Sequence, residues 1–302
     1  MAAEGPRALV RDVRVLSRRI DAALQRPGSP DWIVAAAVVT VLGFLLGTAG
    51  GYGATGLLVA VAITQFVLVL AWVYGTQLVG RKGALVLGAF AAAAADVCVS
   101  VWPHARLGAL LGVFALAVPL LFVHQLARGV ARHHIVVSLG AIAGMAIGTV
   151  GLASLLQLRH EFADQTSPSR VVTSVVAITA GGLVLSLLVD AISPYPRFDP
   201  AVRRGAFGVL ASTGLGASIG YLALQAPGRH DFSEGRGALV GAILGALVAL
   251  LSVAASFAAH SVEPLEGAPP AMSRWARMVL VGVMPIALLA PVAFLICLAV
   301  RV

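Results

Sequence analysis

The chain has 302 residues, of which 59% are hydrophobic and only 11% are charged, and its formal net charge is +8. Soluble domains carry about a quarter charged residues, so a chain this poor in charge cannot cover a water-facing surface. The composition therefore excludes a soluble enzyme and a disordered protein. It also excludes a nucleic-acid-binding domain, because the basic residues lie in short gaps between apolar runs and not along one face. A multi-pass membrane protein remains.

Residues 1–31 are predicted to form a cytoplasmic extension. Between Pro6 and Arg26, apolar side chains recur every three or four positions and several arginines share another face. This pattern is typical of an amphipathic helix that lies on the membrane surface, held by apolar burial and by anionic lipid. The alternative is a solvated extension that only fixes orientation. A signal peptide is not indicated, because the basic stretch is long and the apolar run after it has the length of a span.

Long uncharged runs predict transmembrane helices, since a helix needs about 20 apolar residues to cross the hydrocarbon. The stretch from Trp32 to Gly80 carries no charge and has room for two spans, separated by a glycine-rich turn at 47–53. We expect an all-α polytopic bundle of about nine spans within a transmembrane domain at 32–302. The predicted spans are 32–50, 54–74, 83–102, 107–124, 135–156, 171–192, 206–226, 237–259 and 278–300.

The basic residues predict the orientation of these spans. If the N-terminus is cytoplasmic and the C-terminus external, most of the 21 Lys and Arg residues lie in cytoplasmic segments, as the positive-inside rule requires. All four Trp then lie at span ends, where amphipathic rings are enriched. Arg far outnumbers Lys, and Ala and Gly are abundant, which is typical of a high-GC bacterium. We therefore expect a bacterial cytoplasmic-membrane protein.

Glycines four residues apart indicate how the helices pack. Such spacing makes a smooth groove in which another backbone can approach closely. The alternatives are a sliding surface and a seam between identical copies. Prolines at 119, 285 and 291 interrupt predicted spans, either as structural kinks or as the broken helices that transporters use. The clearest glycine sets are Gly140, Gly144 and Gly148, and Gly237, Gly241 and Gly245.

One acidic residue, Asp96, lies deep within a predicted span. An ionised carboxylate there costs at least about 2.5 kcal/mol, so the side chain must be protonated, paired or exposed to water. One interpretation is a proton or cation site that couples transport. The other is a neutral carboxyl bonded to a helix carbonyl or a hydroxyl. Gln65, also within a span, is a candidate partner.

The cytoplasmic loop after the sixth span is a second candidate site. Asp190 leads into a segment with prolines at 194, 196 and 200 that also holds Arg197 and Asp199. With Arg203 and Arg204, the segment could hold a phosphate headgroup. If so, Arg197 and Asp199 should converge on one pocket. The alternative is a basic loop that only fixes orientation.

Catalytic and cofactor motifs are incomplete. Gly216–Gly220 spells G-x-S-x-G, but inside an apolar helix and not at the strand–helix turn that this motif requires. Residues 75–82 approach a phosphate-binding loop, with Arg81 in place of the Lys and Lys82 in place of the Ser or Thr. The histidines show no ligand spacing. We therefore expect no enzyme activity, no metal and no cofactor.

Residues 237–298 resemble the C-terminal part of phosphatidate cytidylyltransferases. A glycine-rich helix, a polar loop and a final helix with Ala-Pro-Val-Ala at 290–293 follow in the same order. The resemblance implies a degenerate lipid-headgroup enzyme, because the loop at 260–277 lacks that family's His-Gly-Gly and paired Asp, and no site residue carries over. The whole chain is also similar to multi-span membrane proteins of actinobacterial-type bacteria.

These patterns favour a small-molecule transporter or permease, with Asp96 as the coupling group and the last span as the moving part. The alternatives are a non-catalytic structural or assembly subunit of a membrane complex and the degenerate lipid-headgroup enzyme. The expected partners are membrane lipid and either a second copy of the chain or another membrane protein. No nucleic acid is expected, and the transported substrate is left open.

Overall fold

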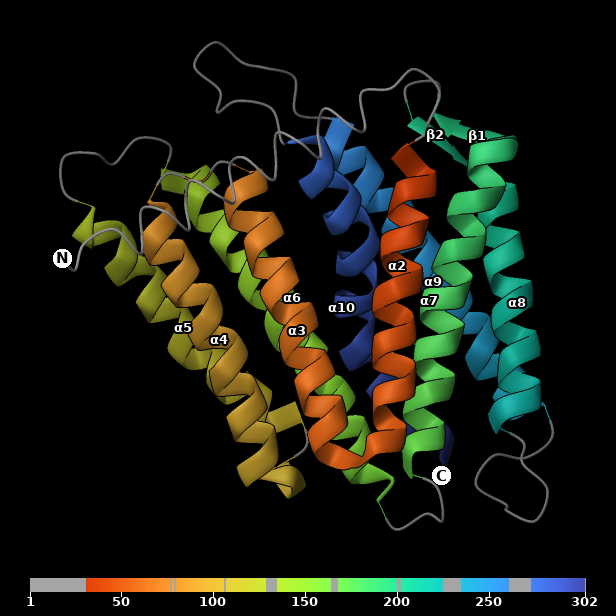
Figure 1. Ribbon diagram of the computed structural model, residues 1–302, viewed down its shortest axis with the longest axis horizontal. Coiled ribbons are helices and arrows are strands. Elements are labelled where there is room, and N and C mark those ends of the chain that lie inside the picture. The colour runs from red at the N-terminus through yellow and green to blue at the C-terminus, as the bar shows by residue number, and fades with distance from the viewer. Residues whose placement is uncertain are drawn as a thin grey trace, which may run out of the picture.

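The computed structural model describes residues 31–76, 78, 80–105, 107–128, 135–163, 168–199, 202–224, 235–260 and 273–301. Long helices dominate it (Figure 1). They are α2 (Asp31–Ala49), α3 (Gly53–Gly75), α4 (Arg81–Val101), α5 (Leu107–Ala127), α6 (Ile135–Glu161), α7 (Pro168–Ile192), α8 (Ala206–Leu224), α9 (Arg236–His260) and α10 (Arg274–Arg301). A small antiparallel hairpin, β1 (Arg197–Asp199) and β2 (Val202–Gly205), joins α7 to α8.

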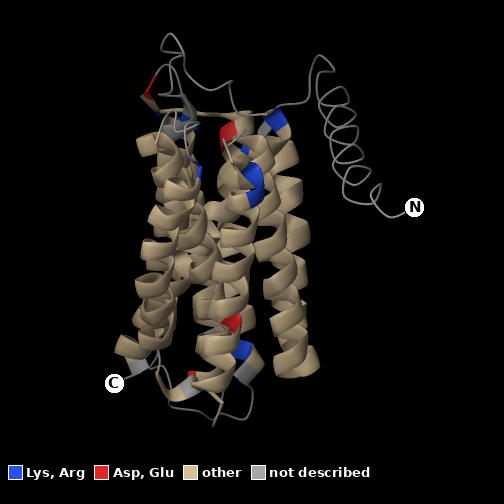
Figure 2. Cartoon of the chain, turned by 90° about the vertical axis from the view of Figure 1, so that its left-hand side faces the viewer, with Lys and Arg blue, Asp and Glu red and all other residues tan. Residues whose placement is uncertain are grey.

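Eight helical segments among the described residues are long and apolar enough to cross a membrane. The first, Trp32–Gly75, contains both α2 and α3, which the short 3-10 turn at Gly50–Tyr52 separates. The structure therefore has the all-α membrane-type bundle that the uncharged runs predict, and each helix begins and ends within a few residues of its predicted range. Charged residues lie mainly toward the two ends of the bundle (Figure 2). The predicted extension at 1–31 lies almost entirely outside the described residues.

The helices form two lobes on either side of α10 (Figure 1). We call α3, α4, α5 and α6 the first lobe, and α2, α7, α8 and α9 the second lobe. Helix α10 contacts α3 and α6 on one side and α2, α7 and α9 on the other. The lobes also touch directly where α2 meets α3 and where α6 meets α7. Helix α10 therefore packs against both lobes.

Glycines bring α8 and α9 of the second lobe into backbone contact. A Cβ atom added to Gly241 would lie 2.0 Å from the Gly216 carbonyl oxygen, and one added to Gly220 would lie 2.2 Å from that of Gly237. A Cβ at Gly245 would lie 2.4 Å from the Ser212 carbonyl oxygen. Larger side chains cannot enter this seam without moving a helix, since each of these neighbours is backbone.

The glycines of the first lobe behave differently. Gly144 lies against the Trp72 ring, and Gly148 lies against Met284 of α10. Among the described residues, nothing approaches within 4 Å of where a Cβ would stand at Gly140, nor at Gly108 and Gly112 of α5. The four-residue spacing is therefore used for close helix contact in one lobe and left open along part of the other.

The prolines do not break their helices. Pro119 lies inside α5, and Pro285 and Pro291 lie inside α10. Pro291 has no N–H to donate to the carbonyl of Ala287, four residues earlier. That carbonyl faces α6, where a Cβ added to Gly151 would lie 2.4 Å from its oxygen. A glycine on α6 thus accommodates the carbonyl that the proline leaves unbonded within the helix.

Candidate functional site

The first buried polar cluster joins three helices of the first lobe. Asp96 of α4 is 8% exposed, and Gln65 of α3 is 1% exposed. The Gln65 amide nitrogen donates to the Asp96 carboxyl oxygen Oδ1 at 3.1 Å and to the Thr149 main-chain carbonyl of α6 at 2.9 Å. The structure therefore brings together the two intramembrane residues that the sequence predicts.

The cluster has more acceptors than donors. Both amide hydrogens of Gln65 are used by the two bonds just described, while its own Oε1 is buried without a partner. The Thr149 hydroxyl is occupied within its helix, where it donates to the Met145 and Ala146 carbonyls. An ionised carboxylate only accepts, whereas a neutral carboxyl supplies one O–H donor. A proton on Asp96 would therefore supply the donor that the cluster lacks.

The cluster lies next to the contact between α6 and α10. Thr149 stands between Gly148, which meets Met284, and Gly151, which meets the Ala287 carbonyl. The Asp96 cluster therefore reaches α10 through one short stretch of α6. This connection was not visible in the sequence, because nothing in the glycine spacing identifies α10 as the neighbour.

The second buried cluster is an ion pair in the second lobe. Arg204 of β2 lies 2.9 Å from the Asp190 carboxylate of α7, and neither side chain is exposed. The same guanidinium donates to the hydroxyls of Ser186 on α7 and Ser252 on α9. It also lies over the Trp32 ring of α2, 5.6 Å from the ring centroid. The opposite charge and the two hydroxyls offset the cost of burying this guanidinium, although its Nε is buried without a hydrogen-bond partner.

Local backbone geometry makes this pair possible. The hairpin returns the chain over the end of α7, and the Gly205 N–H donates to the Asp190 Oδ1 at 3.0 Å. A Cβ at Gly208 would lie 2.7 Å from the carboxylate oxygens, so only glycine fits there without displacing Asp190. Burial lowers the pKa of the Arg204 guanidinium, and the Asp190 carboxylate opposes that shift.

The remaining residues of the predicted loop site lie apart from this pair. Arg197 of β1 is exposed, with its guanidinium 4.9 Å from the centroid of the Tyr195 ring. Asp199 pairs with Val202 across the hairpin backbone. Asp190 is enclosed by Arg204, so the structure does not bring it together with Arg197. The sequence placed Arg204 in the basic loop without identifying it as the partner of Asp190.

The remaining sequence motifs and the comparisons with known proteins identify no activity. Ser218 of the G-x-S-x-G match lies within α8 and donates to the Gly214 carbonyl of its own helix. The described part of the chain holds no group of three His, Cys, Asp or Glu side chains suited to a metal. No protein-family model, no curated protein and no solved structure matches the chain.

Proposed function

We propose that this protein is a multi-pass protein of a bacterial cytoplasmic membrane that transports a small molecule, with Asp96 as the proton-coupling group. The observation that carries the proposal is the buried Asp96–Gln65 contact in the first lobe. We further propose nine spans with a cytoplasmic N-terminus and an external C-terminus. The separation of α2 from α3 at a short turn, and their contact with each other, support that count.

The surroundings of Asp96 favour a carboxyl that gains and loses a proton over one that stays neutral and hydrogen-bonded. A carboxylate in a membrane is costly, and the side-chain donor that Asp96 has among the described residues is a neutral amide. In the second lobe the chain builds a full ion pair around Asp190, with Arg204 as the cation. Around Asp96 the observed partner leaves a buried acceptor unsatisfied. A buried carboxyl that is neutral when protonated, and is costly to hold as a carboxylate, is suited to coupling proton movement to transport.

The α6–α10 contact supplies the mechanical step of the proposal. Loss of the Asp96 proton leaves a charged acceptor beside Gln65, and the amide must reorient or the cluster must admit water. The Thr149 carbonyl that Gln65 binds belongs to the stretch of α6 that meets α10. Helix α10 holds two prolines and contacts both lobes. A change at Asp96 thereby alters how the two lobes meet.

The test uses everted membrane vesicles that contain the full chain and a pH-sensitive dye. Amino acids, sugars, organic acids and organic cations are added one at a time, and the pH change is compared with that of Asp96→Asn. We expect at least one class of solute to move protons in wild-type vesicles and not in the variant. The double variant Arg204→Met with Asp190→Leu removes the other buried acid together with its cation and provides the comparison. A wild-type response that Asp96→Asn retains, or no wild-type response in the panel, contradicts the proposal.

A second candidate function, an assembly subunit, is favoured by the open glycines of the first lobe. In the part of the chain that the structure describes, Gly108, Gly112 and Gly140 have nothing within 4 Å of a Cβ position, which leaves room for the helix of another chain. This candidate predicts a stable complex after mild solubilisation. Gly112→Leu should dissociate that complex without unfolding the chain. A protein that remains a monomer in lipid contradicts it.

A further inference from the structure

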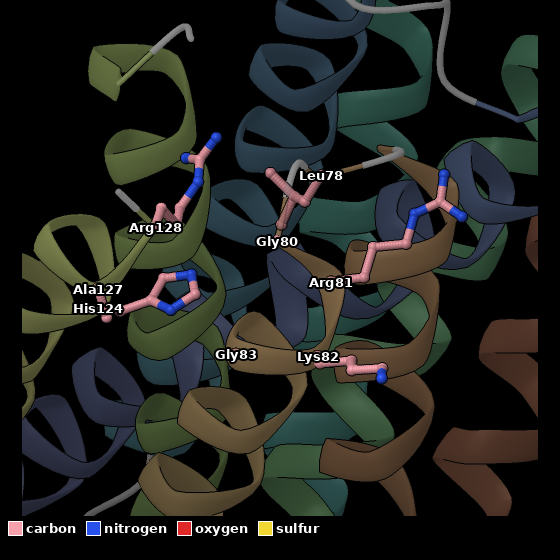
Figure 3. A pocket seen from close by; sticks show the side chains of 8 residues that line it. All are labelled: Leu78, Gly80, Arg81, Lys82, Gly83, His124, Ala127 and Arg128. Atoms are coloured by element: carbon pink, nitrogen blue, oxygen red, sulfur yellow. The ribbon is translucent and has the colours of Figure 1, made fainter. Parts of the chain in front are cut away.

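A basic pocket lies between the start of α4 and the end of α5 (Figure 3). Its volume is about 530 Å³, and its lining comprises Leu78, Gly80, Arg81, Lys82, Gly83, His124, Ala127 and Arg128. The pocket is at the same end of the bundle as the β-hairpin (Figure 1), which is the end we propose to be cytoplasmic. It belongs to neither buried polar cluster.

The lining is cationic and contains no acid. Arg81 and Lys82 extend from the first turn of α4, while His124 lies in the last turn of α5 and Arg128 directly follows that helix on the opposite side (Figure 3). Figure 3 also shows that Arg81 and Lys82 point away from His124, so they contribute charge at the rim. Arg128 donates to Gln125 and to Ser138 of α6, and these bonds fix its side chain.

The backbone of α4 adds donors to the same space. The helix follows Gly80, which has a φ of 80° and provides no side-chain cap. The first backbone bond within the helix start runs from the Ala84 N–H to the Gly80 carbonyl, so the three preceding N–H groups have no helix carbonyl to bind. Unbonded N–H groups at a helix start attract anions, because the helix dipole is positive there.

His124 supplies an independent observation. Its ring lies against Gly83, where a Cβ would come within 2.1 Å of the imidazole Cε1. Its Nε2 is buried and has no hydrogen-bond partner. A buried polar nitrogen without a partner is costly, and it borders a cavity lined by three cations. In the tautomer that carries the ring proton on Nε2, this N–H would donate to an anionic oxygen in the cavity.

We infer that this pocket binds a phosphate group, carried either by an anionic lipid headgroup or by a soluble phosphate. Phosphate oxygens accept from guanidinium, ammonium, imidazole and backbone N–H groups, and these are the donors assembled here. Lipid headgroups lie at the depth of helix ends, where juxtamembrane cations attract them. The inference does not depend on the proposed transport function, because Asp96 belongs to a different part of the lobe.

The test measures lipid retention by the purified chain in nanodiscs. Phosphatidic acid and phosphatidylglycerol are compared with phosphatidylcholine, and inorganic phosphate is added as a competitor. We expect anionic lipid to bind at least about tenfold more weakly to Arg128→Gln, because a charge-assisted bond of 1.5 kcal/mol or more is worth that factor. Lys82→Gln, whose side chain is exposed, should weaken binding by a smaller factor and leaves the Gln125–Ser138 bonds in place.

Arg236→Gln is the matched control. Arg236 also opens a helix after a glycine with positive φ, Gly235, but at the opposite end of the bundle (Figure 1). Anionic-lipid binding that falls in Arg128→Gln and Lys82→Gln, and not in this control, supports a headgroup site. Binding of inorganic phosphate with the same dependence, and no lipid preference, supports the soluble source. Equal binding of both probes to wild type and variants overturns the inference.

Discussion

The two lobes hold a buried acid in two different ways. In the second lobe, Asp190 is paired with Arg204 and accepts from the Gly205 N–H, while the Arg204 guanidinium donates to two serine hydroxyls and lies over the Trp32 ring. In the first lobe, Asp96 receives a hydrogen bond from Gln65, whose own oxygen remains without a donor. The first arrangement satisfies a permanent charge. We propose that a proton satisfies the second.

The two lobes also differ in how closely their helices pack. The α8–α9 seam is closed by glycines in backbone contact, whereas Gly112 and Gly140 of the first lobe face open space. A closely packed seam with a buried ion pair resists movement. We therefore assign the second lobe a supporting role and the first lobe the site of change, with α10 between them.

Replacing Arg204 with Met should have the largest effect on stability. It leaves the Asp190 carboxylate buried without a cation, and loss of one partner of a buried pair costs about 3–5 kcal/mol. The free energy of unfolding in detergent measures the loss. The double variant Arg204→Met with Asp190→Leu should recover much of it. Arg197→Ala, which alters an exposed side chain, is the control and should change little.

Gly241→Ala should destabilise the second lobe by about 1–3 kcal/mol, the usual cost of overpacking a closed interior. The added methyl would lie 2.0 Å from the Gly216 carbonyl oxygen. Gly112→Ala, with open space around it, is the matched control. It should leave the stability unchanged or raise it slightly, since Ala is favoured over Gly in helices. An equal loss of stability in both variants would contradict the difference in packing between the two lobes.

Gly151→Ala should separate α6 from α10. Its methyl meets the Ala287 carbonyl oxygen, which lies 2.4 Å from the Cβ position, and we expect a loss of about 1–2 kcal/mol. Proton movement in vesicles should fall in this variant even when the protein remains folded, because the contact lies between the Asp96 cluster and α10. Gly140→Ala on the same helix is the control. Unchanged proton movement in Gly151→Ala would contradict the role of the α6–α10 contact in coupling at Asp96.

Asp96→Asn should have the smallest effect on stability, below about 1 kcal/mol. A neutral amide has almost the shape of a neutral carboxyl, and it can still accept from Gln65 and donate in return. Asp190→Asn should cost far more, since it leaves Arg204 buried without its counter-ion. Thermal unfolding of both variants in one detergent gives the comparison. A large loss in Asp96→Asn would indicate that Asp96 is held as a charged group.

The fold was largely predictable, and the sites only in part. Uncharged runs located the helices because the hydrocarbon core fixes their length. Asp96 and Gln65 were predictable as a pair because polar groups in apolar spans need partners. Arg204 was harder to assign, since a short hairpin carries it back over α7 and the sequence does not encode that return in any spacing. The α6–α10 contact depends on which helices are neighbours, and hydropathy does not determine this.

The most direct test of the account is the protonation state of Asp96 at neutral pH. Infrared difference spectroscopy of the full chain in lipid, compared with Asp96→Asn and Asp190→Asn, detects the carbonyl band of a neutral carboxyl. We predict a band in the wild type that Asp96→Asn abolishes and Asp190→Asn retains. No such band in the wild type, or one that persists in Asp96→Asn, would contradict the claim that the first lobe holds a proton where the second holds an ion pair.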